Sequence, residues 1–201
     1  MSRLSLSKSS LSKEAKQLKT YERFLPSLDL KRKQLMAERA KARTRLAGTE
    51  KEMAELQRRV GQALPMLANH EVELDDLVKV RQVRLGKENV VGTRLPVLQG
   101  VDLDIRDYGL IAKPHWVDRV VEELSRMLEL RLARQVEQRR LELLEVAVRK
   151  VTQRVNLFEK VLIPRTRENI RRIGIALSDA ERAAVVRAKI AKGKRAKEGL
   201  A

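Results

Sequence analysis

The stretch "VTQRVNLFEKVLIPRTRENI", residues 151–170, decides the fold, because its apolar residues recur in steps of three and four, the spacing of one helix face. The recurring residues before the proline are Val151, Val155, Phe158 and Leu162. Pro164 interrupts the run, yet the pattern resumes with Ile170, Ile173 and Leu177. Because proline removes a backbone hydrogen bond and presses on the carbonyl four residues earlier, we expect a long helix that is bent or hydrated at Pro164 and then continues.

A second apolar stripe runs through the first third of the chain. Its positions, again three and four apart, are Leu18, Tyr21, Leu25, Leu28, Arg32, Leu35, Arg39, Ala42, Leu46, Thr49, Met53, Leu56, Val60, Ala63 and Leu67. Only Arg32, Arg39 and Thr49 break its apolar character. A repeat of 3.5 residues over several heptads predicts a left-handed coiled coil, interrupted or bent at Pro26. A helix with such a stripe needs a partner along its length.

The partner is expected within the same chain. After Pro114 a matching stripe begins, blurs between Leu130 and Val136 in a way typical of a stutter, and then becomes strict. Its positions are Val117, Val121, Leu124, Leu128, Leu141, Leu144, Val148, Val151, Val155, Phe158 and Leu162. The predicted fold class is therefore mainly α: a long antiparallel two-helix coiled coil formed by the N- and C-terminal helices. The spacing of Ser178 and Glu181 resembles a capping box, which predicts a restarted helix there.

The insert between the helices has a different composition. It carries Pro96, Pro114 and several glycines, and its short apolar runs, 77–83, 89–95 and 101–105, are typical of strands bounded by turns. We expect a small head with a β-hairpin. The predicted division is an N-terminal helix over 1–68, an insert head over 69–114 and a C-terminal helix with a basic tail over 115–201.

Composition excludes several classes of protein. The chain of 201 residues has no cysteine, so it has no disulfide and no thiolate metal site, and 35% of its residues are charged, as in long helices. We find no run of the roughly 18 apolar residues that a membrane span requires, and no signal peptide, which predicts a soluble intracellular protein. The net charge of +17 favours an anionic partner: nucleic acid, a membrane surface or an acidic protein cavity.

Side chains capable of catalysis are scarce. The two histidines, His70 and His115, flank the insert without the spacing of a metal site, and "RLGKEN" lacks the glycine spacing of a phosphate loop. We therefore expect no catalytic residue, no cofactor and no metal. Trp116 is interpreted as a packing anchor where the second helix meets the head.

The positive charge gathers at the chain ends. Residues 182–197 carry seven Lys or Arg and no acid, and Arg3, Lys8 and Lys13 lie near the N-terminus. In an antiparallel hairpin these ends coincide. Nucleic acid is one interpretation, but the tails lack aromatics to stack on bases. A frayed, solvated tail is the other.

The sequence resembles the D subunit of V-type (A/V-type) ATPases and ATP synthases. The run "RVNLFEKVLIPRTRENIRRI", residues 154–173, is similar to the family's Arg-Val-Asn-Ala-Leu-Glu followed by Ile-Pro and an Ile-rich turn. The matching residues are Arg154, Val155, Asn156, Glu159, Ile163, Pro164, Ile170 and Ile173. The pair Leu157–Phe158 departs from the family's Ala-Leu.

A second resemblance lies in the insert. "ENVVGTRLPVL", residues 88–98, is similar to the family's Asn-Val-x-Gly-x-x-x-Pro, which places Asn89, Gly92 and Pro96 on the pattern. In the N-terminal helix only Leu28, Lys31, Arg32 and Leu35 fit the family's usual sequence.

The resemblance implies a non-catalytic central rotor shaft that transmits torque between ATP chemistry in a catalytic ring and proton or sodium translocation in a membrane ring. The implied partners are the catalytic and nucleotide-binding ring subunits, the small F subunit of the central stalk and the membrane-side funnel subunit. The implied location is cytoplasmic, attached to the membrane only through partners and without direct nucleic-acid contact. A basic coiled coil that binds nucleic acid, or a scaffold, is the alternative. The candidate interface residues are Asn89, Gly92, Pro96, Trp116, Arg154, Asn156, Glu159, Pro164, Lys192, Lys194 and Arg195.

Overall fold

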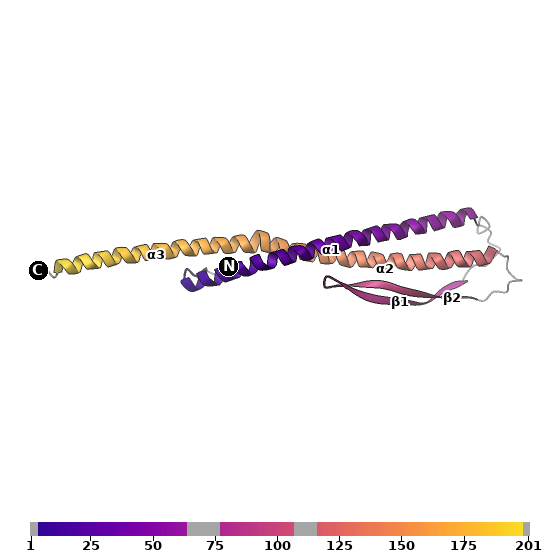
Figure 1. Cartoon of the computed structure of the whole chain (residues 1–201), viewed down its shortest axis with the longest axis horizontal. Helices are drawn as coiled ribbons and strands as arrows, with labels where there is room; N and C mark the ends of the chain where they lie inside the picture. Colours follow the sequence, from indigo (N-terminus) through magenta and orange to yellow (C-terminus); the bar gives the residue numbers. More distant parts are fainter. Residues whose placement is uncertain (1–3, 64–76, 107–115, 199–201) are drawn as a thin grey trace. The chain divides into compact units, whose positions relative to one another are not determined.

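The computed structural model describes residues 4–63, 77–106 and 116–198. The elements in chain order are α1 (Lys8–Ala63), β1 (Val78–Val90), β2 (Thr93–Ile105), α2 (Trp116–Leu157), the π-helical turn η2 (Phe158–Leu162) and α3 (Ile163–Glu198) (Figure 1). The predicted class, mainly α with a small hairpin insert, is confirmed. The chain divides into a terminal unit, residues 1–30 with 151–201, and a hairpin unit, residues 31–150. The predicted domain borders at residues 68 and 114 fall outside the described residues and stay a prediction.

The stripe predicted along α1 is confirmed over nearly all of its length. Every stripe position from Leu18 to Val60 is buried or half-buried, and Leu35, Ala42 and Leu56 are the most enclosed. The prediction is wrong at Ala63, which is exposed at the helix end, and Leu67 lies outside the described residues. Arg32, Arg39 and Thr49 are half-buried because the stripe keeps its helical period through them.

The stripe of α2 is also confirmed from Val117 to Leu162. Between the start of its blurred part and its strict part, Leu130 and Arg140 are both buried, and Ala133 and Glu137 are half-buried between them. Those four residues follow steps of three, four and three. The inward face therefore continues through polar side chains where the sequence loses its apolar pattern.

The turn η2 explains how a long helix continues past Pro164. The inward positions of the terminal unit run Val151, Val155, Phe158 and Leu162 up to the end of the turn. Beyond it they are Ile163, Thr166, Ile170, Ile173 and Leu177, each one residue later than the same rhythm would place them. In η2 the N–H of Ile163 donates to the carbonyl of Phe158, five residues back. A π turn holds one extra residue, so η2 absorbs the one-residue shift of the stripe.

Neither Pro26 nor the region of the predicted helix restart near Ser178 interrupts its helix. Pro26 lies inside α1, which continues to Ala63, and the Ser27 hydroxyl donates to the Phe24 carbonyl at 2.8 Å. The restart near Ser178 is wrong, because α3 runs from Ile163 to Glu198 without interruption. Ser178 lies inside a continuous helix, so its side chain is not needed to cap a new helix start.

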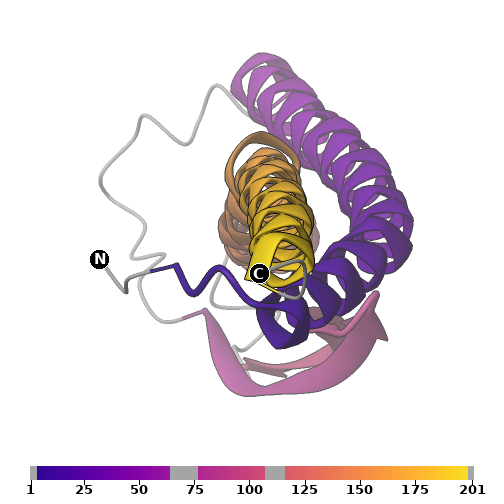
Figure 2. The ribbon, with the colours of Figure 1, turned by 90° about the vertical axis from the view of Figure 1, so that its left-hand side faces the viewer.

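The insert forms two strands where the sequence suggested three short runs. β1 pairs antiparallel with β2 from Val78↔Ile105 to Val90↔Thr93, and the middle run contains the turn. Val91 and Gly92 have φ of 51° and 79°, the two positive values of a type I′ turn, the turn whose twist suits paired strands. Figure 2 shows the two strands curving together. β2 is mostly half-buried, whereas β1 is mostly exposed.

A small apolar cluster closes the base of the hairpin unit. Leu77, Val117 and Val121 are buried together, and Val78 and Trp116 pack against them. The N–H of Arg106 donates to the carbonyl of Leu77 at 3.0 Å, which ties the two ends of the hairpin. Trp116 thus packs where α2 meets the hairpin, as its interpretation as an anchor predicted.

Candidate partner-binding surfaces

The second half of α3 is the most exposed helical segment that the structure describes. Every residue from Asp179 to Arg195 is exposed. The apolar residues Val185, Val186 and Ile190 are each 55% exposed, and Lys192, Lys194 and Arg195 follow them. Cations in the last turns are favoured by the partial negative charge of a helix C-terminus. The segment therefore combines an apolar stretch with a basic end, as a helix that enters a protein cavity would.

Upstream, α1 and α3 are paired within the terminal unit. Arg167 contacts Glu22 at 2.7 Å, and Lys8 contacts Glu181 at 3.6 Å, an antiparallel order. The ring of Tyr21 meets that of Phe158 edge to face, with centroids 5.4 Å apart. Exposed ion pairs add little free energy, so the buried stripe holds this pair together and the polar contacts fix its register.

Four predicted interface residues surround η2. Arg154, Glu159 and Pro164 are exposed, and Asn156 is half-buried. Leu157 and Val161 are 46% and 49% exposed. Leu157 lies three residues after Arg154 and Val161 three before Pro164, so they share the side of the helix of these residues. These two apolar residues were not predicted as interface. Their signal in the sequence is that they are large, apolar and outside the stripe.

An ion-pair cluster follows η2 on α3. Glu168 accepts hydrogen bonds from Arg171 at 2.9 and 3.0 Å and from Arg172 at 2.9 Å. Hydrogen bonds from Arg171 and then Arg172 lower the pKa of Glu168 to about 2. The carboxylate therefore stays ionised and holds both guanidinium groups on the helix surface.

The hairpin carries the other predicted residues. Asn89 and Gly92 are exposed near the tip, and Pro96 is half-buried in β2. A Cβ added at Gly92 would lie 3.2 Å from Nζ of Lys31, besides needing a strained backbone, so the turn favours glycine there. Val91, a β-branched residue at positive φ, is strained. The backbone conformation of the hairpin tip therefore restricts which residues fit there.

Arg140 fastens the hairpin to the helices, and sequence reasoning missed it. Its Nη2 lies 2.6 Å from Oε2 of Glu88 on β1, and its side chain is only 10% exposed. It also lines a hollow of about 290 Å³ with Ala42, Val136 and Pro96. The signal available in the sequence was its place four residues before Leu144, on the same face of the helix.

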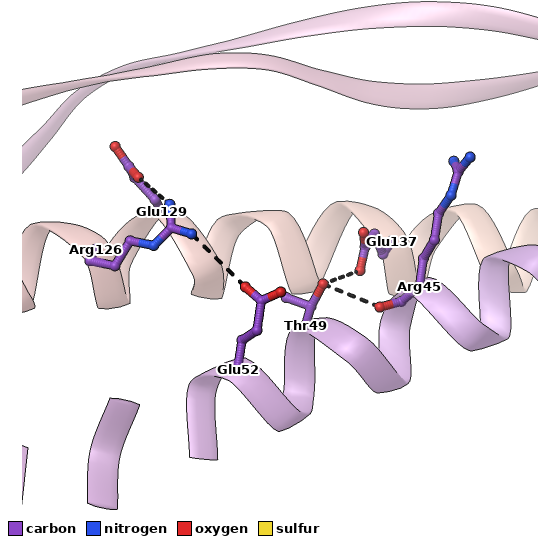
Figure 3. Close-up of polar contacts among 6 residues, drawn as sticks. All are labelled: Arg45, Thr49, Glu52, Arg126, Glu129 and Glu137. Atoms are coloured by element: carbon purple, nitrogen blue, oxygen red, sulfur yellow. Dashed lines mark hydrogen bonds and ion pairs between the residues drawn. The ribbon is translucent and has the colours of Figure 1, made fainter. Parts of the chain in front are cut away.

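A polar layer near Arg140 lies between α1 and α2 (Figure 3). The Thr49 hydroxyl contacts Oε2 of Glu137 at 2.8 Å and the Arg45 carbonyl at 3.3 Å. Arg126 approaches both Glu52, at 3.9 Å, and Glu129, at 3.4 Å. The Thr49–Glu137 and Arg126–Glu52 contacts join the helices at the level where the apolar stripe is interrupted, and they fix register more than they add stability.

Within residues 4–63, 77–106 and 116–198, no three His, Cys, Asp or Glu side chains converge to hold a metal ion. None of the helices in these ranges has an apolar stretch that could span a membrane. His70 and His115 lie outside the described residues.

Comparison with known proteins identifies the family. The sequence matches the family model for the D subunit of ATP synthase over residues 10–193. It is 32% identical to the V-type ATP synthase D subunit of Borreliella burgdorferi over 192 residues, which cover 96% of this chain and 95% of that protein. The proteins of the same name in Chlamydia pneumoniae and Chlamydia trachomatis are 31% and 33% identical, over 94% and 96% of this chain and 91% and 96% of theirs. The chain belongs to the family of ATP synthase D subunits.

Proposed function

We propose that this chain is the central rotor shaft of a V-type ATPase or ATP synthase. It transmits torque between ATP hydrolysis or synthesis in a catalytic ring and proton or sodium movement in a membrane ring, and it contributes no catalytic residue. The observation that carries the proposal is α3 itself. Its first half packs on α1, and its second half, from Asp179 to Arg195, is a regular helix with every side chain exposed.

The exposed half of α3 suits the inside of a ring. Its apolar residues Val185, Val186 and Ile190 would contact the ring subunits. Its basic end would meet acidic or carbonyl-lined surfaces of the ring. Such charge complementarity guides docking and register more than it adds affinity. The partners in this proposal are the catalytic and nucleotide-binding subunits.

The hairpin unit is proposed to bind the other partners, the small F subunit of the central stalk and the membrane-side funnel subunit. Asn89, Gly92, Pro96 and Trp116 belong to that unit, and its exposed β1 offers room for them. The protein would then be cytoplasmic and reach the membrane only through the funnel subunit.

The test is assembly. Lys192, Lys194 and Arg195 changed together to glutamine should reduce recovery of the catalytic ring with the chain, and more so at high salt, because screening weakens the charges that remain. Lys16, Lys19 and Arg23, exposed on α1, changed together to glutamine are the matched control for lost charge. Equal recovery of the ring with both variants would contradict the proposed role of the basic end.

The rival is a basic coiled coil that binds nucleic acid, favoured by the run of basic residues on an exposed helix. That interpretation predicts tight, salt-sensitive binding of DNA or RNA by the isolated chain, with no ring subunits recovered from cells. Recovery of ring subunits in fixed stoichiometry, and only weak nucleic-acid binding at physiological salt, would exclude it.

A further inference from the structure

Near its tip, the outer edge of β1 carries backbone groups of Leu85, Lys87 and Asn89 that bond to no other backbone group among the described residues. In a hairpin with a two-residue turn, the residues flanking the turn exchange both hydrogen bonds, and pairs then alternate along the strands. Val90↔Thr93, Glu88↔Leu95 and Gly86↔Val97 are therefore the hydrogen-bonded pairs. Leu85, Lys87 and Asn89 point their N–H and C=O groups away from β2.

Pro96 supports this assignment and distinguishes the two edges. It pairs with Lys87, a position whose N–H would face away from the partner strand. A proline is tolerated there because no ladder hydrogen bond is lost. The outer edge of β2 therefore lacks a donor at Pro96, and β2 is mostly half-buried. The outer edge of β1 has all its donors and is mostly exposed.

The side chains of β1 indicate what the edge would take. Leu85 is 57% exposed, and Lys87 and Asn89 are exposed beside it. The strand carries four basic residues, Lys79, Arg81, Arg84 and Lys87, of which Arg84 already pairs with Asp102 on β2 at 2.9 Å. Its one acid, Glu88, is bound by Arg140. A second copy of β1 would bring like charges together, which disfavours self-pairing. An acidic strand would be complementary.

We propose that the outer edge of β1 at Leu85, Lys87 and Asn89 binds an extended, acidic segment of another protein by β-strand addition. Main-chain hydrogen bonds would supply the attachment, and alternating acidic and apolar side chains the selectivity. This goes beyond the proposed rotor function and does not depend on it, because the edge belongs to the hairpin unit whatever ring the chain enters.

The probe is a blocked heptapeptide in which glutamate alternates with valine, added to the full-length chain and followed by amide exchange in NMR spectra. Before addition, Gly86, Glu88 and Val90 should be protected by the ladder, while Leu85, Lys87 and Asn89 exchange quickly. At saturation the latter three should become protected at least tenfold. The lysine analogue of the peptide should not protect them.

Two variants test the edge directly. Lys87→Pro removes an outward N–H of β1 and should weaken peptide binding at least tenfold. Arg94→Pro is the matched control. Arg94 pairs with Asn89, so its N–H faces the outer edge of β2, and this substitution removes one positive charge just as Lys87→Pro does. Should either variant fold poorly, a peptide methylated on alternate backbone nitrogens tests the same bonds on the unchanged chain.

Absence of peptide binding, equal binding of the lysine analogue, or equal loss in Lys87→Pro and Arg94→Pro would overturn the proposal. Undiminished binding of the methylated peptide would do the same. A concentration-dependent dimer that Lys87→Pro abolishes would also overturn it, since the edge would then hold a second copy of the chain.

Discussion

The two halves of α3 are equally helical and differ in what surrounds them. From Ile163 to Leu177 the helix buries a stripe against α1, with Ile173 fully enclosed. From Asp179 to Arg195 it buries nothing within the described chain, yet it carries Val185, Val186 and Ile190. The first half is a helix because packing requires it, and the second because alanine, arginine and lysine favour it. The difference fits the proposal that the second half binds a partner.

The largest effect is expected where the stripe changes phase. Deleting Gln153, an exposed residue upstream of η2, would rotate everything downstream by about 100° relative to Val151. Deleting Val161 together with Pro164→Ala would turn η2 into an α turn and leave the stripe aligned. We expect the Gln153 deletion to lower the free energy of unfolding by at least about 3 kcal/mol, and the Val161 variant by about 1 kcal/mol or less.

Chemical unfolding followed by circular dichroism measures both deletions. If the two cost the same, η2 does not absorb the phase shift.

Single substitutions in the two halves of α3 sharpen the comparison. Ile173→Ala removes a fully enclosed side chain and should cost about 2–5 kcal/mol, whereas Ile190→Ala, at a residue 55% exposed, should change stability by about 0.5 kcal/mol or less. Thermal melts of the isolated chain show this. In the assembled complex Ile190→Ala should become the more costly of the two substitutions, because Ile190 would then lie against the ring. A large cost at Ile190 in the isolated chain would mean that the second half of α3 is already packed.

Pro164→Ala alone is expected to have a smaller effect on stability. The packing of Ile163, Thr166 and Ile173 fixes the phase of the stripe, so the π turn should remain, and the stability should rise or stay level because alanine restores a donor. If Pro164 itself bends the proposed shaft and that bend supplies asymmetry to the catalytic ring, ion pumping per ATP should fall in this variant. An unchanged ratio would reject a role for the bend and leave the rotor proposal standing.

The smallest effect concerns Glu168. Because its pKa is about 2 when folded, below the ordinary value of 4.5, the contribution of its ion pairs is fully present above pH 4.5 and is lost as the pH falls towards 2. NMR titration of the carboxyl group should give a midpoint near 2, and Arg171→Ala should raise it more than Arg167→Ala does. A midpoint near 4.5 in the unchanged chain would show that the arginines do not hold this carboxylate.

The sequence predicted the parts of the fold that rest on periodicity. The stripes of α1 and α2 and the presence of a hairpin follow from spacing and turn residues, and Trp116 packs where it was expected. The π turn was not predicted, because a one-residue phase shift appears only when burial is known on both sides of Pro164. Arg140 and Glu88 were missed because a salt bridge between residues 52 positions apart leaves no local pattern. The hairpin was interpreted as three runs because Gly86 and Gly100 lie within strands.

The central claim is that the exposed half of α3 acts in torque transmission and not in folding. Its most direct test is a chain shortened by residues 186–201 and reconstituted into the complete complex, with ions pumped and ATP hydrolysed measured together. The proposal predicts a melting temperature of the isolated chain close to that of the full chain, and a lower ratio of ions pumped to ATP hydrolysed. An unchanged ratio, in a complex shown to contain the shortened chain, would contradict it.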